Sequence, residues 1–161
     1  MSLQRTLNVL VLLATLGWAC WVTAGGGLLP GNGLVQTEEQ PPGYLGRIEL
    51  NNPDGVAAAL RRAESFYHGE GMREEEIPPL VLVIHGSEVG IFFKENYSQY
   101  KPIVDLAAKL TAFQVIDIRV CEASAQIMGL DIKTRFPFVG TVPYGPAEIT
   151  RLIEVEKYIY F

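Results

Sequence analysis

The chain has little cysteine and little histidine. Two residues of each type occur among 161, and Cys20 lies in an apolar N-terminal stretch, so Cys121 is the only cysteine in the rest of the chain. An intramolecular disulfide and a CxxC redox motif are therefore excluded there. The wide separation of His68 and His85 does not fit a metal site, and the sequence indicates no metal and no cofactor.

The chain also lacks a cluster of basic residues, and its formal net charge is −5 at pH 7. Without Lys and Arg side chains to follow a phosphate backbone, nucleic-acid binding is disfavoured. With 48% apolar and 19% charged residues, the composition also excludes intrinsic disorder, collagen-like repeats and a polytopic membrane protein. What remains is one globular domain of about 120 residues behind an N-terminal segment.

The N-terminus has the pattern of a targeting segment. Arg5 precedes an apolar run, and small residues ending at Ala24 fit cleavage by a signal peptidase. We expect residues 1–24 to be a cleaved signal peptide or an N-terminal membrane anchor, because residues 7–24 just reach the length that spans a bilayer. In either case the protein is exported to the periplasm, soluble after cleavage or tethered by the N-terminal helix.

The rest of the chain divides into a linker and a domain. Residues 25–43 are rich in Gly and Pro and are expected to be flexible. In residues 44–161, strand-like and helix-like segments alternate with connections too long for hairpins, which is typical of βα units around a parallel sheet. We therefore predict a three-layer α/β/α fold with a mostly parallel, five-stranded, flavodoxin-like sheet.

The apolar patterns predict individual elements. The run LVLVI at 80–84 has no polar face, which indicates a strand buried on both sides. Residues 113–121 alternate, with Phe113, Val115, Asp117, Arg119 and Cys121 on one face. The other expected strands are 44–50, 139–142 and 158–161, and the expected helices are 54–67 with Asp54 as cap, 100–110 with Pro102 in its first turn, 122–128 and 146–155.

Cys121 stands where a predicted strand ends and a predicted helix begins. Free N–H groups and the helix dipole at such a position favour a thiolate and lower the pKa of a thiol. Arg119, two residues earlier on the same strand face, could add positive charge. The alternative is that Cys121 packs in the core as a small apolar side chain.

His85 follows the central strand 80–84, at the edge of an α/β sheet where ligands commonly bind. If the strands 80–84 and 113–121 are neighbours, His85 and Cys121 reach one cleft, and the imidazole could hold a proton for the thiol. Alternatively, His85 only satisfies backbone groups at the strand end. The candidate catalytic residues are therefore Cys121, His85 and Arg119.

Three stretches resemble, in order and spacing, the DsrE/DsrF-like family, small α/β proteins of which several members act in sulfur relay. They are residues 81–86 (VLVIHG), 118–124 (IRVCEAS) and 142–145 (VPYG), the last leading through Ile149 and Leu152 to 158–160 (YIY). The resemblance implies a parallel-sheet domain that is usually oligomeric. It also implies that Cys121 occupies the position where sulfurtransferase members carry a persulfide.

Two functions from different classes follow. In the first, the exported protein is a persulfide carrier or sulfurtransferase-like enzyme, in which Cys121 accepts a sulfane sulfur and passes it on while His85 and Arg119 keep the thiol ionised. In the second, it is a non-catalytic oligomeric binding or assembly module of the same fold, with or without a membrane tether. The expected partners are a sulfur donor or acceptor protein and further copies of the chain, since Asp117 and Arg119 share a face with apolar residues and the segment 158–161 is aromatic.

Overall fold

A computed structural model describes residues 41–48, 51–69 and 78–161. The predicted leader, residues 1–24, and nearly all of the predicted linker lie outside the described residues, so both stay predictions. Within the part of the chain that the structure describes, no helix combines the length and the apolar character needed to cross a membrane.

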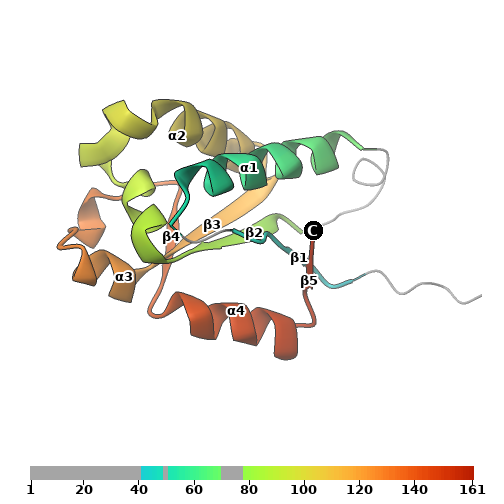
Figure 1. Ribbon diagram of the computed structural model, residues 1–161. Coiled ribbons are helices and arrows are strands. Elements are labelled where there is room, and N and C mark those ends of the chain that lie inside the picture. Colours follow the sequence, from blue (N-terminus) through green and yellow to red (C-terminus); the bar gives the residue numbers. More distant parts are fainter. Residues whose placement is uncertain (1–40, 49–50, 70–77) are drawn as a thin grey trace, which may run out of the picture. The chain divides into compact units, whose positions relative to one another are not determined.

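The domain is built on five parallel strands in the order β4-β3-β2-β1-β5 (Figure 1). The strands are β1 (Tyr44–Leu45), β2 (Leu80–Ile84), β3 (Ile116–Cys121), β4 (Gly140–Val142) and β5 (Ile159–Tyr160). The predicted α/β class and five-stranded parallel sheet are confirmed. β2 and β3 are neighbours, paired from Leu80 opposite Ile116 to Ile84 opposite Val120.

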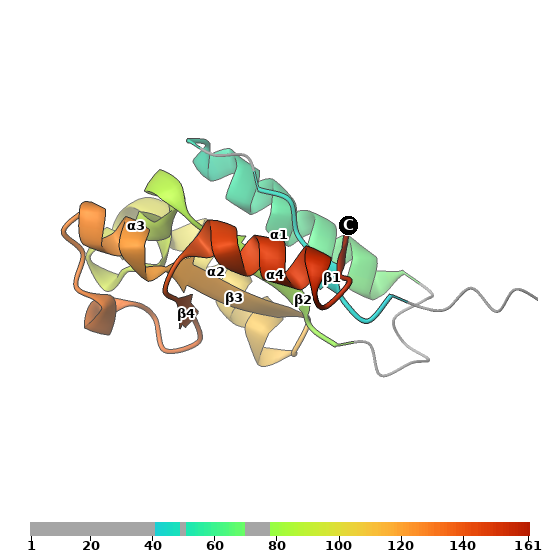
Figure 2. The ribbon, with the colours of Figure 1, turned by 90° about the horizontal axis from the view of Figure 1, so that it is seen from below.

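Helices cover the two faces of the sheet unequally. α1 (Pro53–His68) and α2 (Tyr97–Ala112) lie on one face, and α4 (Gly145–Glu154) lies alone on the other, where Figure 2 shows it crossing the sheet. The short α3 (Glu122–Ile127) joins β3 to β4 and packs its Ala125 into the core on the α1–α2 side. Three 3₁₀ segments complete the fold: η2 (Gly86–Phe92), η3 (Lys94–Asn96) and η4 (Ile132–Thr134).

The apolar core has a large part and a small part, one on each face of the sheet. The strand β2 contributes to both, because Leu82 and Ile84 belong to the large cluster under α1 and α2, whereas Val81 and Val83 belong to the small cluster under α4. This explains why residues 80–84 are a continuous apolar run. The small cluster contains few other buried residues, among them Leu152 of α4.

Two predicted element starts are corrected by the structure. The cap of α1 is Asn52, whose side chain accepts a hydrogen bond from the N–H of Asp54 at 3.1 Å, so Asp54 lies inside the first turn and does not cap the helix. α2 begins at Tyr97 rather than at residue 100, but its backbone breaks at Tyr100 (φ −111°, ψ 17°). Pro102 therefore falls in the first turn of the segment after the break, where its missing N–H costs least.

β3 starts later than predicted, at Ile116. Phe113 is the C-cap of α2, and Gln114 adopts a left-handed φ of 57°. The N–H groups of Gln114 and Val115 donate to Thr111 and Leu110, each at 2.9 Å, which is the pattern of a Schellman motif. The predicted alternation therefore holds only from Ile116 to Val120, and placing 113–115 in the strand was wrong. Cys121, predicted to share the face of Asp117 and Arg119, instead packs in the large cluster with Ile118 and Val120. β1 and β5 are also shorter than predicted, at two residues each.

The segment η2 was not predicted at all. It is an irregular, largely buried stretch that follows His85 and places Val89, Ile91 and Phe92 in the large cluster. It also carries the carboxylate of Glu88 into the interior, where one of its oxygens accepts a hydrogen bond from Ser87 at 2.9 Å. The stretch connects β2 to α2 over the end of the sheet that carries the candidate site.

Candidate functional site

The parallel strands bring two of the predicted site residues to one edge of the sheet. Ile84 of β2 lies opposite Val120 of β3, so His85 stands level with Cys121. After β3 the chain enters α3 on the α1–α2 side, and after β4 it enters α4 on the other side. Ligands of open α/β sheets commonly bind where neighbouring strands send their connections to opposite faces.

Gly145, the first residue of α4, lies between His85 and Cys121. A Cβ atom added at Gly145 would lie 2.9 Å from the Cβ of His85 and 3.3 Å from the Cβ of Cys121. Both separations are shorter than ordinary van der Waals contact, so the three segments meet here without strain only because residue 145 has no side chain. His85 and Cys121 therefore flank the same stretch of backbone.

The sulfur of Cys121 is surrounded by hydrogen-bond donors. Cys121 is the N-cap of α3, and its Sγ accepts a hydrogen bond from the backbone N–H of Ser124 at 3.4 Å. The hydroxyl of Ser124 and the backbone N–H of Gly145 also act on this sulfur as donors that lower the pKa of the thiol. The N–H of Ala123 lies beside the sulfur as well but donates to the carbonyl of Pro143 at 3.2 Å. Donors from the first turns of two helices, α3 and α4, thus converge on one thiol.

These donors decide the ionisation of the thiol. Burial raises the pKa of the Cys121 thiol because the charged form loses solvation, but the hydrogen bonds from Ser124 and Gly145 and the nearby N–H of Ala123 lower that pKa by more. The pKa therefore lies below the ordinary value for cysteine. The thiolate, which is the nucleophilic form, is favoured at this position.

Ser124 is a site residue that the sequence did not single out. Its Oγ accepts a hydrogen bond from the backbone N–H of Gly86 at 3.0 Å while its hydroxyl donates to the sulfur of Cys121. It therefore connects the segment after β2 with the thiol after β3. The available signal was a serine three residues after the N-cap position, where a first-turn side chain can fold back toward the cap.

Cys121 is nevertheless enclosed by protein. The residue is 1% exposed and belongs to the large apolar cluster, so the packed-cysteine alternative describes part of its surroundings. The cover is thin, because His85 is only half-buried and Tyr144, which precedes Gly145, is 56% exposed.

Arg119 lies on the α4 face of β3, and its guanidinium is engaged by two carboxylates. Its Nη2 and Nε donate to Asp117 at 2.6 and 2.9 Å, and its Nη1 donates to Glu148 at 2.5 Å. These hydrogen bonds do not involve the sulfur. The structure therefore brings His85 and Cys121 together, whereas it places the charge of Arg119 in an ion-pair network that ties β3 to α4.

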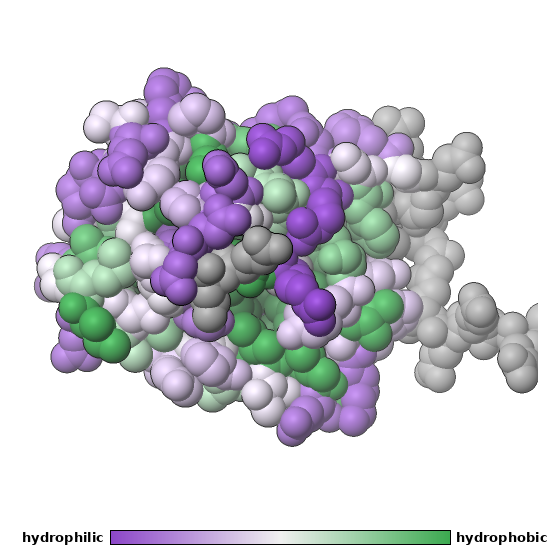
Figure 3. All heavy atoms as spheres, viewed as in Figure 1, coloured by the Kyte–Doolittle hydropathy of each residue, from purple (hydrophilic) through white to green (hydrophobic). Residues whose placement is uncertain are grey.

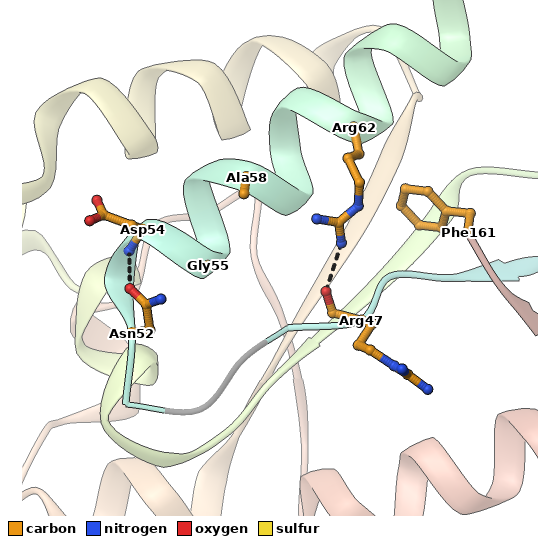
Figure 4. A pocket seen from close by; sticks show the side chains of 7 residues that line it. All are labelled: Arg47, Asn52, Asp54, Gly55, Ala58, Arg62 and Phe161. Carbon is orange, nitrogen blue, oxygen red and sulfur yellow. Dashed lines mark hydrogen bonds between the residues drawn. The ribbon is translucent and has the colours of Figure 1, made fainter.

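Two cavities adjoin the loop after β1. One of about 450 Å³ lies at the N-terminus of α1 and contains none of the predicted site residues (Figure 4). The other, of about 190 Å³, lies on the α4 side and has His85, Arg47 and Ile149 in its wall. Among the residues that the structure describes, no three His, Cys, Asp or Glu side chains gather as a set of metal ligands.

Comparison with other proteins gives a match over most of the domain, at residues 55–161. The chain belongs to the DsrE/DsrF-like family. A similar solved structure is that of a protein of unknown function from Methanobacterium thermoautotrophicum, with 17% sequence identity and a TM-score of 0.57, covering 73% of this chain and 96% of that chain. At this identity the likeness shows a shared fold and no shared activity. No curated protein matches the chain.

Membership of the DsrE/DsrF-like family confirms the resemblance found in the three sequence stretches. The matched residues include His85, Arg119, Cys121, Ser124 and Gly145, so the whole site lies on the part of the chain that carries the family fold. Sulfur-relay chemistry is what this family membership suggests. The role of each residue in this chain has to be argued from the contacts described above.

Proposed function

We propose that this DsrE/DsrF-like protein carries sulfur as a persulfide on Cys121. The observation that supports the proposal is the convergence of N–H donors from α3 and α4 on the Cys121 sulfur, which lowers the pKa of the thiol. In the proposed step the thiolate attacks the outer sulfur of a persulfide donor. The donor's S–S bond breaks, the donor leaves as its own thiolate, and Cys121 becomes the persulfide without any external oxidant or reductant.

The neighbouring residues divide the supporting roles. Ser124 and Gly145 stabilise the negative charge on sulfur through hydrogen bonds, and they can stabilise a persulfide anion in the same way. His85, on the other side of Gly145, is the candidate to hold or release a proton during transfer. Arg119 acts as a positioning residue, because its ion pair with Glu148 fixes α4 and hence the N–H of Gly145.

The proposal includes a partner and a location. Ile127 and Met128 at the end of α3 and Tyr144 beside Gly145 are exposed apolar side chains close to the site in sequence and fold. Figure 3 shows hydrophobic patches in its lower half, where Figure 1 draws α3 and α4. A sulfur donor or acceptor protein could dock there, and the pattern of residues 1–24 supports an exported, periplasmic site of action.

Self-association is part of the same proposal. Phe113, Ile159 and Tyr160 are large apolar side chains between 43% and 64% exposed, and contact with a second copy of the chain would remove them from water. Light scattering on residues 38–161, the compact unit of the chain, is expected to report more than one subunit. A monomer at high micromolar concentration would contradict this expectation.

A second candidate function is a non-catalytic assembly module of the same fold. The observation that favours it is the 1% exposure of Cys121 within the large apolar cluster, which is also what an inert core cysteine shows. The two functions make opposite predictions about the chemistry of the thiol.

The test measures alkylation and sulfuration of Cys121 in a Cys20→Ser background, so that Cys121 is the only thiol that can react. Under the proposed function, the alkylation rate reaches half its maximum at a pH below the ordinary pKa of a thiol, about 8.5. Incubation with polysulfide adds the mass of one sulfur atom to the parent and nothing to Cys121→Ser. An unreactive, unmodified thiol in the folded protein would support the assembly module and contradict the persulfide carrier.

A further inference from the structure

A small pocket of about 190 Å³ lies beside the thiol site, on the face of the sheet that α4 covers. Its wall combines the ends of β1 and β2 with Ile149 of α4 and Tyr160 of β5. Sites for drug-sized ligands usually measure about 300–1,000 Å³, so this pocket suits only a small ligand. None of the residues that line it is acidic.

Arg47 directs its charge toward this pocket. Its backbone carbonyl accepts a hydrogen bond from Arg62 at 2.8 Å, while its side chain points away from α1 (Figure 4). The guanidinium lies over the ring of Tyr160, 4.8 Å from the ring centre, which fixes its position without neutralising it. Among the described residues, no carboxylate lies within ion-pair distance of Arg47.

The acidic residue next to the pocket wall is already engaged. Glu148 precedes Ile149 on α4, and its carboxylate accepts hydrogen bonds from Arg151 and Arg119. Hydrogen bonds from these two arginines hold the pKa of the Glu148 carboxyl below its ordinary value, against the effect of its partial burial. Glu148 is therefore an anion whose charge is already matched, and the pocket keeps the positive charge of Arg47.

His85 connects the pocket to the thiol. Its side chain lines the pocket, and its Cβ lies 2.9 Å from the position of a Cβ on Gly145, whose other neighbour is Cys121. His85 thus borders the pocket that Arg47 also lines, and it lies against the first residue of α4, which packs against Cys121. A ligand bound by Arg47 and His85 would therefore lie next to a residue that also contacts the start of α4 beside Cys121.

We propose that this pocket binds a small oxyanion, held by the guanidinium of Arg47 and the imidazole of His85, and that it receives the anionic end of the small molecule that exchanges sulfur with Cys121. The volume excludes a nucleotide or a peptide, and the absence of acidic lining together with a fixed guanidinium selects an anion. The second half of this statement rests on the proposed persulfide function. The first half, anion binding, stands on the pocket alone.

The first experiment measures anion binding with sulfite as the probe and chloride at equal ionic strength as the reference. Calorimetry, or the chemical shifts of the His85 ring, follows the titration of the Cys20→Ser protein. Arg47→Gln is expected to weaken sulfite binding at least about tenfold, the effect of losing one charge-assisted hydrogen bond. Arg61→Gln is the matched control, because Arg61 is exposed on α1 and does not line this pocket.

The second experiment asks whether the pocket leads to the thiol. Iodoacetate and iodoacetamide alkylate Cys121 through the same chemistry, but only iodoacetate is an anion. The rate constant for iodoacetate divided by that for iodoacetamide is expected to fall several-fold in Arg47→Gln and to remain unchanged in Arg61→Gln. Because the neutral reagent is measured on the same variant, a general change in the thiol does not alter the ratio.

The outcomes separate the two proposals. Anion binding by the pocket is overturned if sulfite does not bind, or if Arg47→Gln binds it as well as Arg61→Gln does. The link between the pocket and Cys121 is overturned if the alkylation ratio is the same in both variants. If sulfite binds through Arg47 but neither reagent modifies Cys121, anion binding is supported and the persulfide function is contradicted.

Discussion

The two faces of the sheet differ in how much apolar surface they bury and in which polar groups they carry. Under α1 and α2, buried side chains such as Leu60, Leu82 and Phe92 form a large apolar cluster. Under α4, the apolar cluster is small, and an ion-pair network through Arg119 and Glu148 takes up part of the surface that remains. The face under α1 and α2 carries most of the buried apolar side chains, and the face under α4 carries a pocket, the guanidinium of Arg47 and the first turn of a helix that packs against a thiol.

The largest expected effects compare the same substitution on the two faces. Leu60→Ala, on α1, should lower the free energy of unfolding by about 4 kcal/mol, because the filled cluster cannot close over the cavity. Leu152→Ala, on α4, should cost about 2 kcal/mol, because a single helix over a small cluster can shift toward the sheet. Urea unfolding of both variants measures the difference. Equal losses would mean that α4 is held as rigidly as α1.

Gly145→Ala is expected to cost about 1–3 kcal/mol, since a Cβ placed 2.9 Å from that of His85 forces α4 outward. The same movement withdraws an N–H from the Cys121 sulfur, so the pKa of the thiol should rise. Urea unfolding and the pH dependence of alkylation measure the two effects on one variant. Gly129→Ala is the control for a glycine substitution with no neighbour within 4 Å, although its φ of +70° adds strain of its own. Only Gly145→Ala should alter the thiol.

Ser124→Ala should destabilise the protein by about 1 kcal/mol, because the N–H of Gly86 loses its acceptor. It should also raise the pKa of the Cys121 thiol, because a donor to the sulfur is lost. Ser98→Ala, at an exposed position in the first turn of α2, serves as the control and should leave the thiol unchanged. An unaltered alkylation profile in Ser124→Ala would show that the serine hydroxyl does not stabilise the thiolate.

Cys121→Ser should change stability least, by under about 1 kcal/mol near pH 6, because serine accepts the same N–H bonds as the thiol. The folded-state pKa of Cys121 is lowered, so the parent should gain stability over the serine variant as pH rises from the folded pKa to the ordinary pKa of a thiol. That advantage is lost again as pH falls through the folded pKa. Unfolding of both proteins between about pH 6 and about pH 10 measures it. A constant difference across this range would contradict a stabilised thiolate.

Whether a feature could be predicted from the sequence depends on whether it is set by local or by long-range interactions. The central strand and the meeting of His85 with Cys121 could be predicted, because an apolar run and the alignment of parallel strands follow from local pattern. The start of β3 could not, since residues 113–115 alternate like a strand but close the end of α2 through the left-handed backbone at Gln114. Nothing in the sequence periodicity marks η2 as a buried 3₁₀ segment.

The details of the site needed the tertiary structure. Arg119 looks like a cation available to Cys121 when only its strand is considered, but its partner Glu148 comes from α4, 29 residues later. Gly145 and Ser124 lie within stretches that the sequence had already marked, yet their contacts with the sulfur exist only because α4 and η2 dock at the same edge. Short-range rules singled out Cys121, and long-range packing supplied the hydrogen bonds to its sulfur.

The short outer strands have a consequence for how this protein behaves at high concentration. β4 and β5, the two borders of the sheet, contain three and two residues, against six in β3. An exposed strand border is a template on which other chains can add strands and grow into fibrils, and the hazard increases with its length. Borders this short offer few unpaired backbone groups, so further strands are not readily added at either side of the sheet. We therefore expect any assembly of several copies to use side-chain surfaces instead of a continuous sheet.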